Sequence, residues 1–365
     1  MARQSPRLFS GMTSFTDIPL SVLDLATVRA GMTNAEALAQ TIEAARVADE
    51  LGYRRFWVAE HHGMAAVASS APAVLIGAIA AATRRIRVGS GGVMLPNHSS
   101  LVIAEQFGTL VALHGDRIDL GLGRAPGTDG LTARMLRRSV ANETADDFPE
   151  QVVELLALFG IIPPLENGIG GSVVAVPGLG DAPLLWLLGS SGFSAQLAGM
   201  MGLPFVFAHH FAGSAETPRA FELYRQRFTP SAVLDEPLAM VSLSALVADD
   251  AEEAARLALP NNLWAVRLRQ GGRPGQVPTL AEAEAHPWSA GELAFAAERN
   301  AQQAIGTTDH ARDRIAALVG ATGANEVIVA PQGPDLDSRL RTLTDLAAAP
   351  GDARSFAAAR PASAV

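Results

Sequence analysis

The chain has 365 residues, of which 48% are hydrophobic and 18% are charged, so it is long and apolar enough to bury a large core. Its formal net charge of -9 argues against a nucleic-acid partner, because nonspecific binding to phosphates depends on clustered Lys and Arg. All 28 basic residues are Arg and there is no Cys, which excludes a P-loop lysine, a Schiff-base lysine and thiolate chemistry.

The beginning of the chain, Met1 to Thr16, carries Arg and polar residues without the apolar stretch of a signal peptide. No apolar run reaches the ~20 residues that a membrane-spanning helix needs. We therefore expect a soluble, cytoplasmic protein without a membrane partner.

The main part of the chain repeats one pattern: a short apolar run rich in β-formers, a turn with Gly, Ser or His, and a helix with 3.6-residue apolar spacing. This pattern is typical of parallel βαβ units, and eight such units predict an α/β fold that closes into a single (β/α)₈ TIM barrel. The eight predicted strands are Leu20–Leu23, Arg55–Ala59, Ile86–Gly89, Ile118–Leu122, Leu184–Leu188, Pro204–Phe207, Ala239–Val247 and Glu326–Ala330.

The helix after the first strand has a clear start signal. Thr33 and Glu36 predict a capping box, in which each side chain accepts a backbone N–H at the helix N-terminus. Leu38, Ile42 and Ala45 follow at helical spacing and form one apolar stripe. We expect this stripe to pack against the barrel.

Two stretches interrupt the repeat, namely Ile161–Ala182, which is rich in Gly and Pro, and Leu259–Asn300. Insertions in such barrels commonly form lids or walls of the active site. We therefore expect one domain over residues 1–348, and a flexible tail rich in Ala, Pro and Ser over residues 349–365.

The predicted strand ends are unusually polar. Reactive groups in this fold lie at the carboxyl ends of the strands, so polar residues there are expected to meet on one rim. These residues are Asp24, Glu60, His61, His62, Ser90, Arg124, Ser190, Ser191, His209, His210 and Gln332.

Three segments at these strand ends resemble the bacterial luciferase-like flavin monooxygenases: Phe56–His62 (FWVAEHH), Val88–Pro96 (VGSGGVMLP) and Arg117–Arg124 (RIDLGLGR). The resemblance implies reduced FMN as cosubstrate, molecular oxygen and a small organic molecule as the other substrates, and a homodimer packed through barrel helices. No dinucleotide fingerprint is present, since the third glycine of Gly121–Gly127 comes one residue late. Reduced flavin is therefore expected from a separate flavin reductase.

The resemblance also implies which residues contact the cofactor. Ser90, Gly91 and Gly92 match a bulge that supports the flavin ring, with a non-prolyl cis peptide at the bond between the two glycines. Arg124 matches the arginine that binds the flavin phosphate, and its planar fork suits that group.

A second part of the phosphate site is expected before the fifth helix. Gly189, Ser190 and Ser191 lie there, where hydroxyls and free backbone N–H groups suit an anion. Taken alone, Ser190 is better explained as a helix N-cap without a ligand, and Gly91 and Gly92 equally well as an ordinary glycine-rich strand end.

His61 matches the active-site histidine of the family and is the expected catalytic residue, because an imidazole can donate a hydrogen bond or move a proton near neutral pH. Alternation along an extended chain points His62 to the other side, and Glu60 is expected to orient its neighbours. His209 falls where the family places a residue against the flavin ring, with a space-filling rim side chain as the alternative. His98 is a weaker candidate for the site wall.

Several other functions are compatible with the same residues. The barrel could use a deazaflavin coenzyme for hydride transfer, or bind flavin without catalysis. A metal hydrolase is disfavoured, and no metal is expected, because a metal-bridging lysine is absent and adjacent histidines diverge along a strand. Gly123 stands where bacterial luciferase has a reactive cysteine, so the resemblance implies neither light emission nor a particular substrate.

Overall fold

The strands form a closed parallel barrel in the computed structural model, which describes residues 15–136, 147–210, 216–271 and 275–347. The sheet order is β6-β5-β4-β3-β2-β1-β9-β7-β8, and an additional pairing of β6 with β7 closes the ring of eight strands. The described strands are β1 Leu20–Asp24, β2 Arg55–Val58, β3 Arg87–Met94, β4 Ile118–Gly123, β5 Leu184–Gly189, β6 Phe205–Ala208, β7 Ala239–Val247, β8 Ala304–Gly306 and β9 Glu326–Pro331.

The eight strands predicted from the sequence are the eight strands of the barrel, so the predicted fold is confirmed. The short β8 was not predicted, because three residues are too few to show alternation; it pairs with β7 outside the ring. The predicted flexible tail lies outside the described residues.

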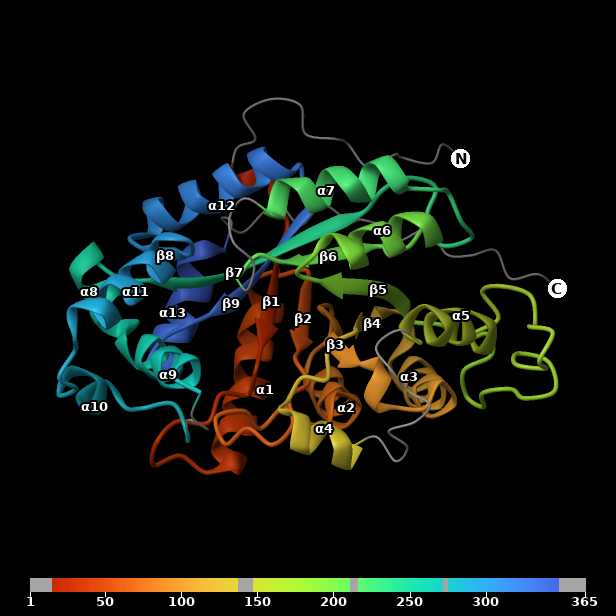
Figure 1. Ribbon diagram of the computed structural model, residues 1–365, viewed down its shortest axis with the longest axis horizontal. Helices are drawn as coiled ribbons and strands as arrows, with labels where there is room; N and C mark the ends of the chain where they lie inside the picture. Colours follow the sequence, from red (N-terminus) through yellow and green to blue (C-terminus); the bar gives the residue numbers. More distant parts are fainter. Residues whose placement is uncertain (1–14, 137–146, 211–215, 272–274, 348–365) are drawn as a thin grey trace.

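Helices surround the barrel, with α1, α2 and α3 on one side of the strands and α6, α7 and α12 on the opposite side (Figure 1). The described α-helices are α1 Asn34–Glu50, α2 Pro72–Ala82, α3 Ser100–His114, α4 Gly130–Leu136, α5 Phe148–Leu158, α6 Gly192–Met201, α7 Glu216–Arg227, α8 Ala251–Leu257, α9 Leu259–Arg269, α10 Leu280–Glu284, α11 Ala290–Ala301, α12 Thr308–Thr322 and α13 Leu336–Leu346. Within the described ranges, no helix combines the length and the apolar character that a membrane span requires.

The capping box predicted at Thr33 and Glu36 is present at the start of α1. The second insertion, by contrast, is more regular than the sequence suggested, since it contains α9, α10 and α11. Of these helices, α11 lies beside β8, and α9 and α10 lie below it in Figure 1. Capping boxes at Thr279 and Ser289 begin the last two of these helices and are the signal that sequence reasoning overlooked. Residues 161–182 consist of turns and one isolated bridge.

Alternate side chains of the strands fill the barrel as a separate apolar cluster, which contains Leu23, Trp57, Ala59, Trp186, Val206, Met240, Ile328 and Ala330. The two tryptophans meet edge to face, with ring centroids 5.6 Å apart. Gly89 makes room for Asp119 and Trp57, because a Cβ at this position would lie 2.5 Å from the carbonyl oxygen of Asp119 and 2.9 Å from Nε1 of Trp57. The middle of the barrel is therefore packed with apolar side chains.

Below this layer, at the amino ends of the strands, lies a buried group of charges. Asp119 accepts hydrogen bonds from Arg55 Nη1 at 2.7 Å, from Arg87 Nη2 at 2.7 Å and from Trp57 Nε1 at 3.0 Å. Arg55 also donates through Nε to Glu326 at 2.9 Å. These carboxylates and guanidinium groups neutralise one another inside the protein.

Candidate active site

His61 lies in the loop after β2, on the inward side that alternation from Arg55 and Trp57 predicts. Its Nδ1 is 3.2 Å from the carbonyl oxygen of Gly127. A carbonyl only accepts, so Nδ1 carries the proton and Nε2 of the neutral ring keeps its lone pair. Burial lowers the pKa of His61, although the Gly127 carbonyl and the nearby Glu60 oppose this shift. His61 is therefore a neutral base near pH 7.

Beside this histidine, β3 carries an irregularity at its carboxyl end. The register with β4 shifts between Ser90 and Val93, and the Gly91–Gly92 peptide bond is cis, as the family resemblance implied. A Cβ on Gly91 would lie 2.7 Å from Leu23 Cδ1, and one on Gly92 would lie 2.8 Å from the carbonyl oxygen of Gly121. Glycine is therefore required at position 92, where a Cβ would meet backbone, whereas a Cβ at position 91 would require the Leu23 side chain to move.

Arg124 follows β4, and its guanidinium carbon lies 4.1 Å from the ring centroid of Phe193 in the first turn of α6. Ser191 is the N-cap of α6, yet its side chain makes no capping hydrogen bond. Ser190 is exposed next to it. In the described part of the chain, Arg124 has neither a hydrogen bond nor an ion pair, so free donors from β4 and α6 meet at one place.

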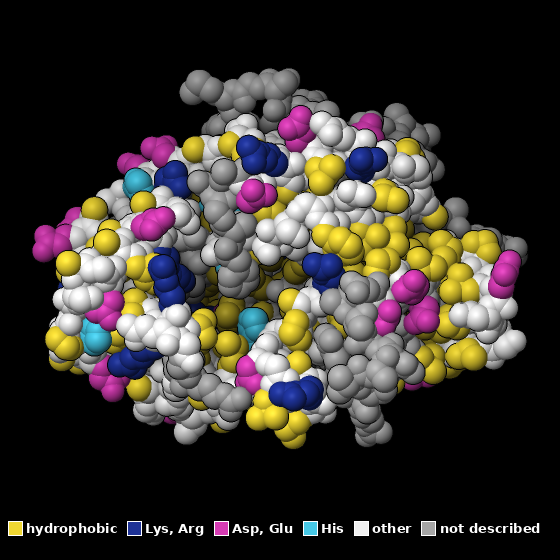
Figure 2. All heavy atoms as spheres, in the orientation of Figure 1, with side chains coloured by type: hydrophobic (Ala, Val, Ile, Leu, Met, Phe, Trp, Pro, Cys, Tyr) yellow, Lys and Arg dark blue, Asp and Glu magenta, His cyan; other side chains and the backbone are white. Residues whose placement is uncertain are grey.

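This donor set fits a flavin phosphate, since it combines a planar guanidinium, hydroxyls and the N–H groups of a helix N-terminus. Gly189 contributes by its lack of a side chain, because a Cβ there would collide with the side chain of Ser194 and push α6 away from β5. Figure 2 shows a hollow near the middle of the face drawn, with hydrophobic and histidine side chains in it and arginine side chains on either side.

Comparisons with known proteins agree with this geometry. The family model described as luciferase-like monooxygenase matches residues 18–326. The chain belongs to the luciferase-like monooxygenase family. It is accordingly an oxidoreductase that acts with incorporation of molecular oxygen.

Individual relatives cover most of its length. A luciferase-like monooxygenase of Escherichia coli (strain K12) is 43% identical over 89% of this chain and 95% of its own. The N-acetyl-S-alkylcysteine monooxygenase of Bacillus subtilis (strain 168) is 38% identical over 65% of this chain and 70% of its own. The crystal structure of apo-MsnO8 is 36% identical, has a TM-score of 0.81, and covers 91% of this chain and 97% of that chain.

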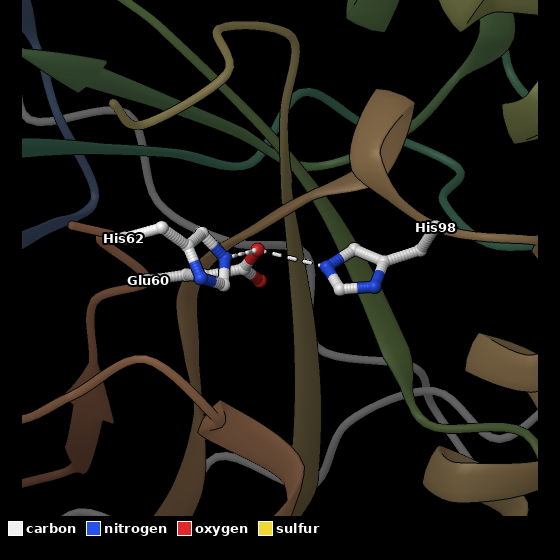
Figure 3. A group of neighbouring side chains, drawn as sticks. All are labelled: Glu60, His62 and His98. Atoms are coloured by element: carbon white, nitrogen blue, oxygen red, sulfur yellow. Dashed lines mark hydrogen bonds and ion pairs between the residues drawn. The ribbon is translucent and has the colours of Figure 1, made fainter. Parts of the chain in front are cut away.

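In this luciferase-like monooxygenase, Glu60 joins two further histidines (Figure 3). Its Oε1 lies 2.8 Å from Nε2 of His62 and 2.8 Å from Nε2 of His98, while Oε2 accepts the backbone N–H of Met94 at 3.2 Å. Burial would raise the pKa of the Glu60 carboxyl, but these hydrogen bonds and the charge of His98 lower it to about 2. The ionised carboxylate only accepts, so both histidines donate through Nε2.

Further hydrogen bonds connect the loops that carry Glu60, His62 and His98 to the loop after β4. The backbone N–H of His62 donates to Gly127 O at 3.2 Å, and Thr128 Oγ1 donates to His62 O at 2.5 Å. Asn97 Nδ2 donates to Pro126 O at 2.9 Å. The loops after β2, β3 and β4 are thus held together, which agrees with the orienting role expected for Glu60.

Among the described residues, Glu60, His62 and His98 are also the group whose ligand atoms converge closely enough for a metal ion, all within 4.8 Å of one another. The sequence reasoning expected no such group, because it assumed that neighbouring histidines diverge. His62 does diverge from His61, but it meets His98, which comes from the loop after β3.

His209, which is expected against the flavin ring, is buried and contacts α7 and the residue after α11. Its Nδ1 lies 2.7 Å from Thr217 Oγ1 on α7, and its Nε2 lies 3.3 Å from the carbonyl oxygen of Gln302. The chain turns directly after β6, where the N–H of His209 bonds Phe207 O at 3.0 Å, and this turn aims the ring at the surrounding helices.

His210 takes the inward place instead. Its Nδ1 lies 2.8 Å from Oγ of Ser242, which belongs to the inward-facing row of β7 together with Met240. Burial, followed by the charge of Arg299, lowers the pKa of His210 to about 3. Counting by two from Val206, which faces inward, predicts His210, so the signal was present in the sequence.

Proposed function

We propose that this luciferase-like monooxygenase uses reduced FMN, supplied by a separate reductase, to insert one atom of O₂ into a small organic substrate. One observation carries the proposal: Arg124 stacks on the first turn of α6 beside Ser190 and Ser191, on the same rim as His61. This arrangement provides an anion site at the correct end of the barrel for a phosphorylated cofactor.

The residues of this rim would have different roles. Arg124, Ser190 and Ser191 would bind the phosphate, and the Gly91–Gly92 backbone would support the ring. Reduced flavin, when bound, supplies the two electrons with which one oxygen atom enters the substrate and the other leaves as water. His210, rather than His209, is then the histidine that borders the ring or the substrate.

His61 is the proposed catalytic residue. Its Nδ1–H is held by the Gly127 carbonyl, so Nε2 has a fixed direction and is free to accept a proton or, once protonated, to donate one. The lowered pKa keeps the ring neutral before the reaction, which suits a group that first accepts a proton.

Other functions are less well supported. A deazaflavin coenzyme would fit the same phosphate site, but it transfers hydride without consuming oxygen, whereas the family incorporates oxygen. A purely flavin-binding role leaves the fixed Nε2 of His61 without a use. A metal hydrolase would need the ligand atoms of Glu60, His62 and His98, which already bond one another.

The substrate class can be approached through the Bacillus subtilis relative, whose name states that it acts on N-acetyl-S-alkylcysteines. We propose small thioethers of this kind as the first compounds to test. N-acetyl-S-methylcysteine is a simple member of the class and has a neutral counterpart, its carboxamide.

The test supplies FMN, NADH and a separate flavin reductase under ¹⁸O₂ and analyses the products by mass spectrometry. We expect one labelled oxygen atom in the product and negligible NADH oxidation when the reductase is omitted. Rapid NADH oxidation by the chain alone would contradict the two-component proposal, and absence of label from every oxidised product would contradict oxygen insertion.

We further propose a homodimer that packs through α2 and α3. Val74 on α2 is 76% exposed, and Val102 and Leu113 on α3 are 45% and 71% exposed, so the two neighbouring helices present apolar side chains to solvent. Light scattering of the wild type and of a Val74→Asp/Leu113→Asp variant tests this: the wild type should be dimeric and the variant monomeric. A cytoplasmic location stays a prediction.

A further inference from the structure

Arg299 near the end of α11 stands out among the arginines of the second insertion. The side chain is partly buried, and its Nε is shielded from solvent without a hydrogen-bond partner. In the described part of the chain, no carboxylate pairs with it. Burying a charge without a partner is costly, so such a residue indicates a missing anion.

The surroundings of Arg299 are polar but contain no acid. It lines a small cavity with five neutral polar residues, which are Ser244 on β7, Asn261 and Asn262 on α9, Gln303 and Gln332. The enclosed space takes about one water-sized group, which is the size of a single carboxylate oxygen rather than of a whole phosphate.

Two of the four amide groups around the cavity, those of Gln303 and Gln332, use their oxygen atoms within the protein. Oε1 of Gln303 accepts the backbone N–H of Ser244 at 2.7 Å, and Oε1 of Gln332 accepts from Asn261 Nδ2. Both acceptor atoms are thus in use, whereas neither Nε2 has a partner among the described residues. Asn261 and Asn262 differ, because their Nδ2 groups donate to Gln332 and Asn300. The donors that the cavity offers to an oxygen anion are therefore the Arg299 guanidinium and the two glutamine Nε2 groups.

The cavity lies beside the proposed reaction site. Ser244 lines the cavity and stands two residues along β7 from Ser242, whose Oγ lies 2.8 Å from His210 Nδ1. After burial, the charge of Arg299 also lowers the pKa of His210. Arg124, by contrast, belongs to the β4 and β5 side of the ring, whereas Ser244 and Gln332 belong to the β7 and β9 side. A flavin whose phosphate is bound at Arg124 would leave Arg299 available to a second molecule.

We propose that Arg299 binds the carboxylate of the organic substrate, so that this enzyme prefers small carboxylate-bearing substrates over their neutral counterparts. The inference rests on the proposed function, since it places the substrate beside the flavin. It adds a recognition residue on α11, together with a donor pair from Gln303 and Gln332, which hold the anionic end of the molecule.

The test measures binding by isothermal titration calorimetry in the presence of saturating oxidised FMN. The probes are N-acetyl-S-methylcysteine and its carboxamide, and the variants are Arg299→Gln and Arg267→Gln. Arg267 is exposed on the neighbouring α9 and controls for the change of net charge. We expect the wild type and Arg267→Gln to bind the carboxylate roughly 10- to 100-fold more tightly than the amide, and Arg299→Gln to lose this preference.

Two readouts separate recognition from a structural role. Arg299→Gln removes an unpaired charge, so its thermal unfolding temperature should equal or exceed that of the wild type, and its affinity for FMN should be unchanged. A clear drop in either quantity would overturn the proposal. So would a wild type without preference, whether it binds both probes equally or neither, and so would a preference that survives in Arg299→Gln.

The same experiment distinguishes this inference from the proposed function, because binding beside oxidised FMN requires no turnover. If the ¹⁸O experiment fails while Arg299 still selects the carboxylate, the oxygenase proposal is wrong and the recognition site stands. If oxygen is inserted but the carboxylate preference is absent or survives in Arg299→Gln, only the role of Arg299 is wrong.

Discussion

The two ends of the barrel treat their charged residues in opposite ways. At the amino ends of the strands, Arg55 and Arg87 share the carboxylate of Asp119, and Arg55 also bonds Glu326. At the mouth, Arg124 and Arg299 have no ion pair within the described residues. Charges that the protein itself neutralises stabilise the fold, whereas charges left without partners are available to ligands. We therefore expect the charged residues at the amino ends of the strands to contribute to stability and those at the mouth to contribute to function.

The largest effect that tests this division is expected for His61→Ala. Loss of a positioned acid or base typically costs about 10²–10⁴ in rate, so oxygenated product should fall by that factor while oxygen is diverted to hydrogen peroxide. FMN affinity and unfolding should be nearly unchanged, because among the described residues the His61 side chain bonds only the Gly127 carbonyl.

The measurement compares product and peroxide yields after a single turnover with reduced FMN. His61→Gln, which keeps a hydrogen-bond donor but cannot take up a proton near neutral pH, separates orientation from proton transfer. His310→Ala, an exposed residue of α12, is the control. Unchanged yields in His61→Ala would remove His61 from the mechanism.

At the opposite end, Asp119→Ala should lower the free energy of unfolding by about 3–5 kcal/mol, because it leaves two guanidinium groups buried without their carboxylate. Urea denaturation measures this loss. Asp249→Ala breaks the exposed pair of Asp249 with Arg341 and should lower the free energy of unfolding much less, because solvent screens exposed ion pairs. Equal losses in both variants would contradict a structural role for the buried group.

Arg124→Ala should have a smaller and more selective effect at the mouth. A charge-assisted hydrogen bond contributes about 1.5–3 kcal/mol, so FMN binding should weaken by roughly 10- to 100-fold while riboflavin binding changes little. Fluorescence titration of both flavins measures the ratio, with Arg134→Ala on exposed α4 as the control. Equal weakening of both flavins would make Arg124 a general support of the site instead of a phosphate ligand.

The smallest effect concerns pH. His210 has a folded-state pKa of about 3, below the 6.5 of an ordinary histidine, so the unfolded chain binds its proton first as pH falls. Stability linked to His210 is therefore present above pH 6.5 and is lost progressively toward pH 3, with a loss of about 1–2 kcal/mol between pH 7 and pH 5.

Unfolding curves of His210→Gln and of the exposed control His310→Gln test this, and only the former should flatten the decline between pH 7 and pH 5. The stability contributed by Asp119, at the amino ends of the strands, should not change between pH 7 and pH 5. The pKa of Asp119 is lowered chiefly by Arg55 and Arg87 against the opposing effect of burial, so its contribution is lost only below about pH 4, where an unfolded aspartate is protonated. If the free energy of unfolding declines equally steeply between pH 7 and pH 5 in wild type and in His210→Gln, His210 is not the cause of the decline.

The sequence by itself determined the barrel and the rim of the site. Regular alternation in runs such as Ala239–Val247 and helical spacing after Thr33 are local properties, and parallel closure follows from their order. The motifs around His61, Gly91 and Arg124 fixed the family, because each motif is contiguous in the chain. Alternation also contained the correct placing of His210, had it been counted from Val206.

Only the tertiary structure decided which distant groups meet. Glu60 joins His62 to His98, which lies 38 residues away, and Arg299 reaches the mouth from an insertion without a recognisable motif. The turn after Ala208 brings His209 to Thr217 and His210 to Ser242. Such contacts depend on where separate loops pack, and the sequence of each loop does not contain that information. Whether an arginine is paired or unpaired is likewise decided by the neighbours that folding brings to it.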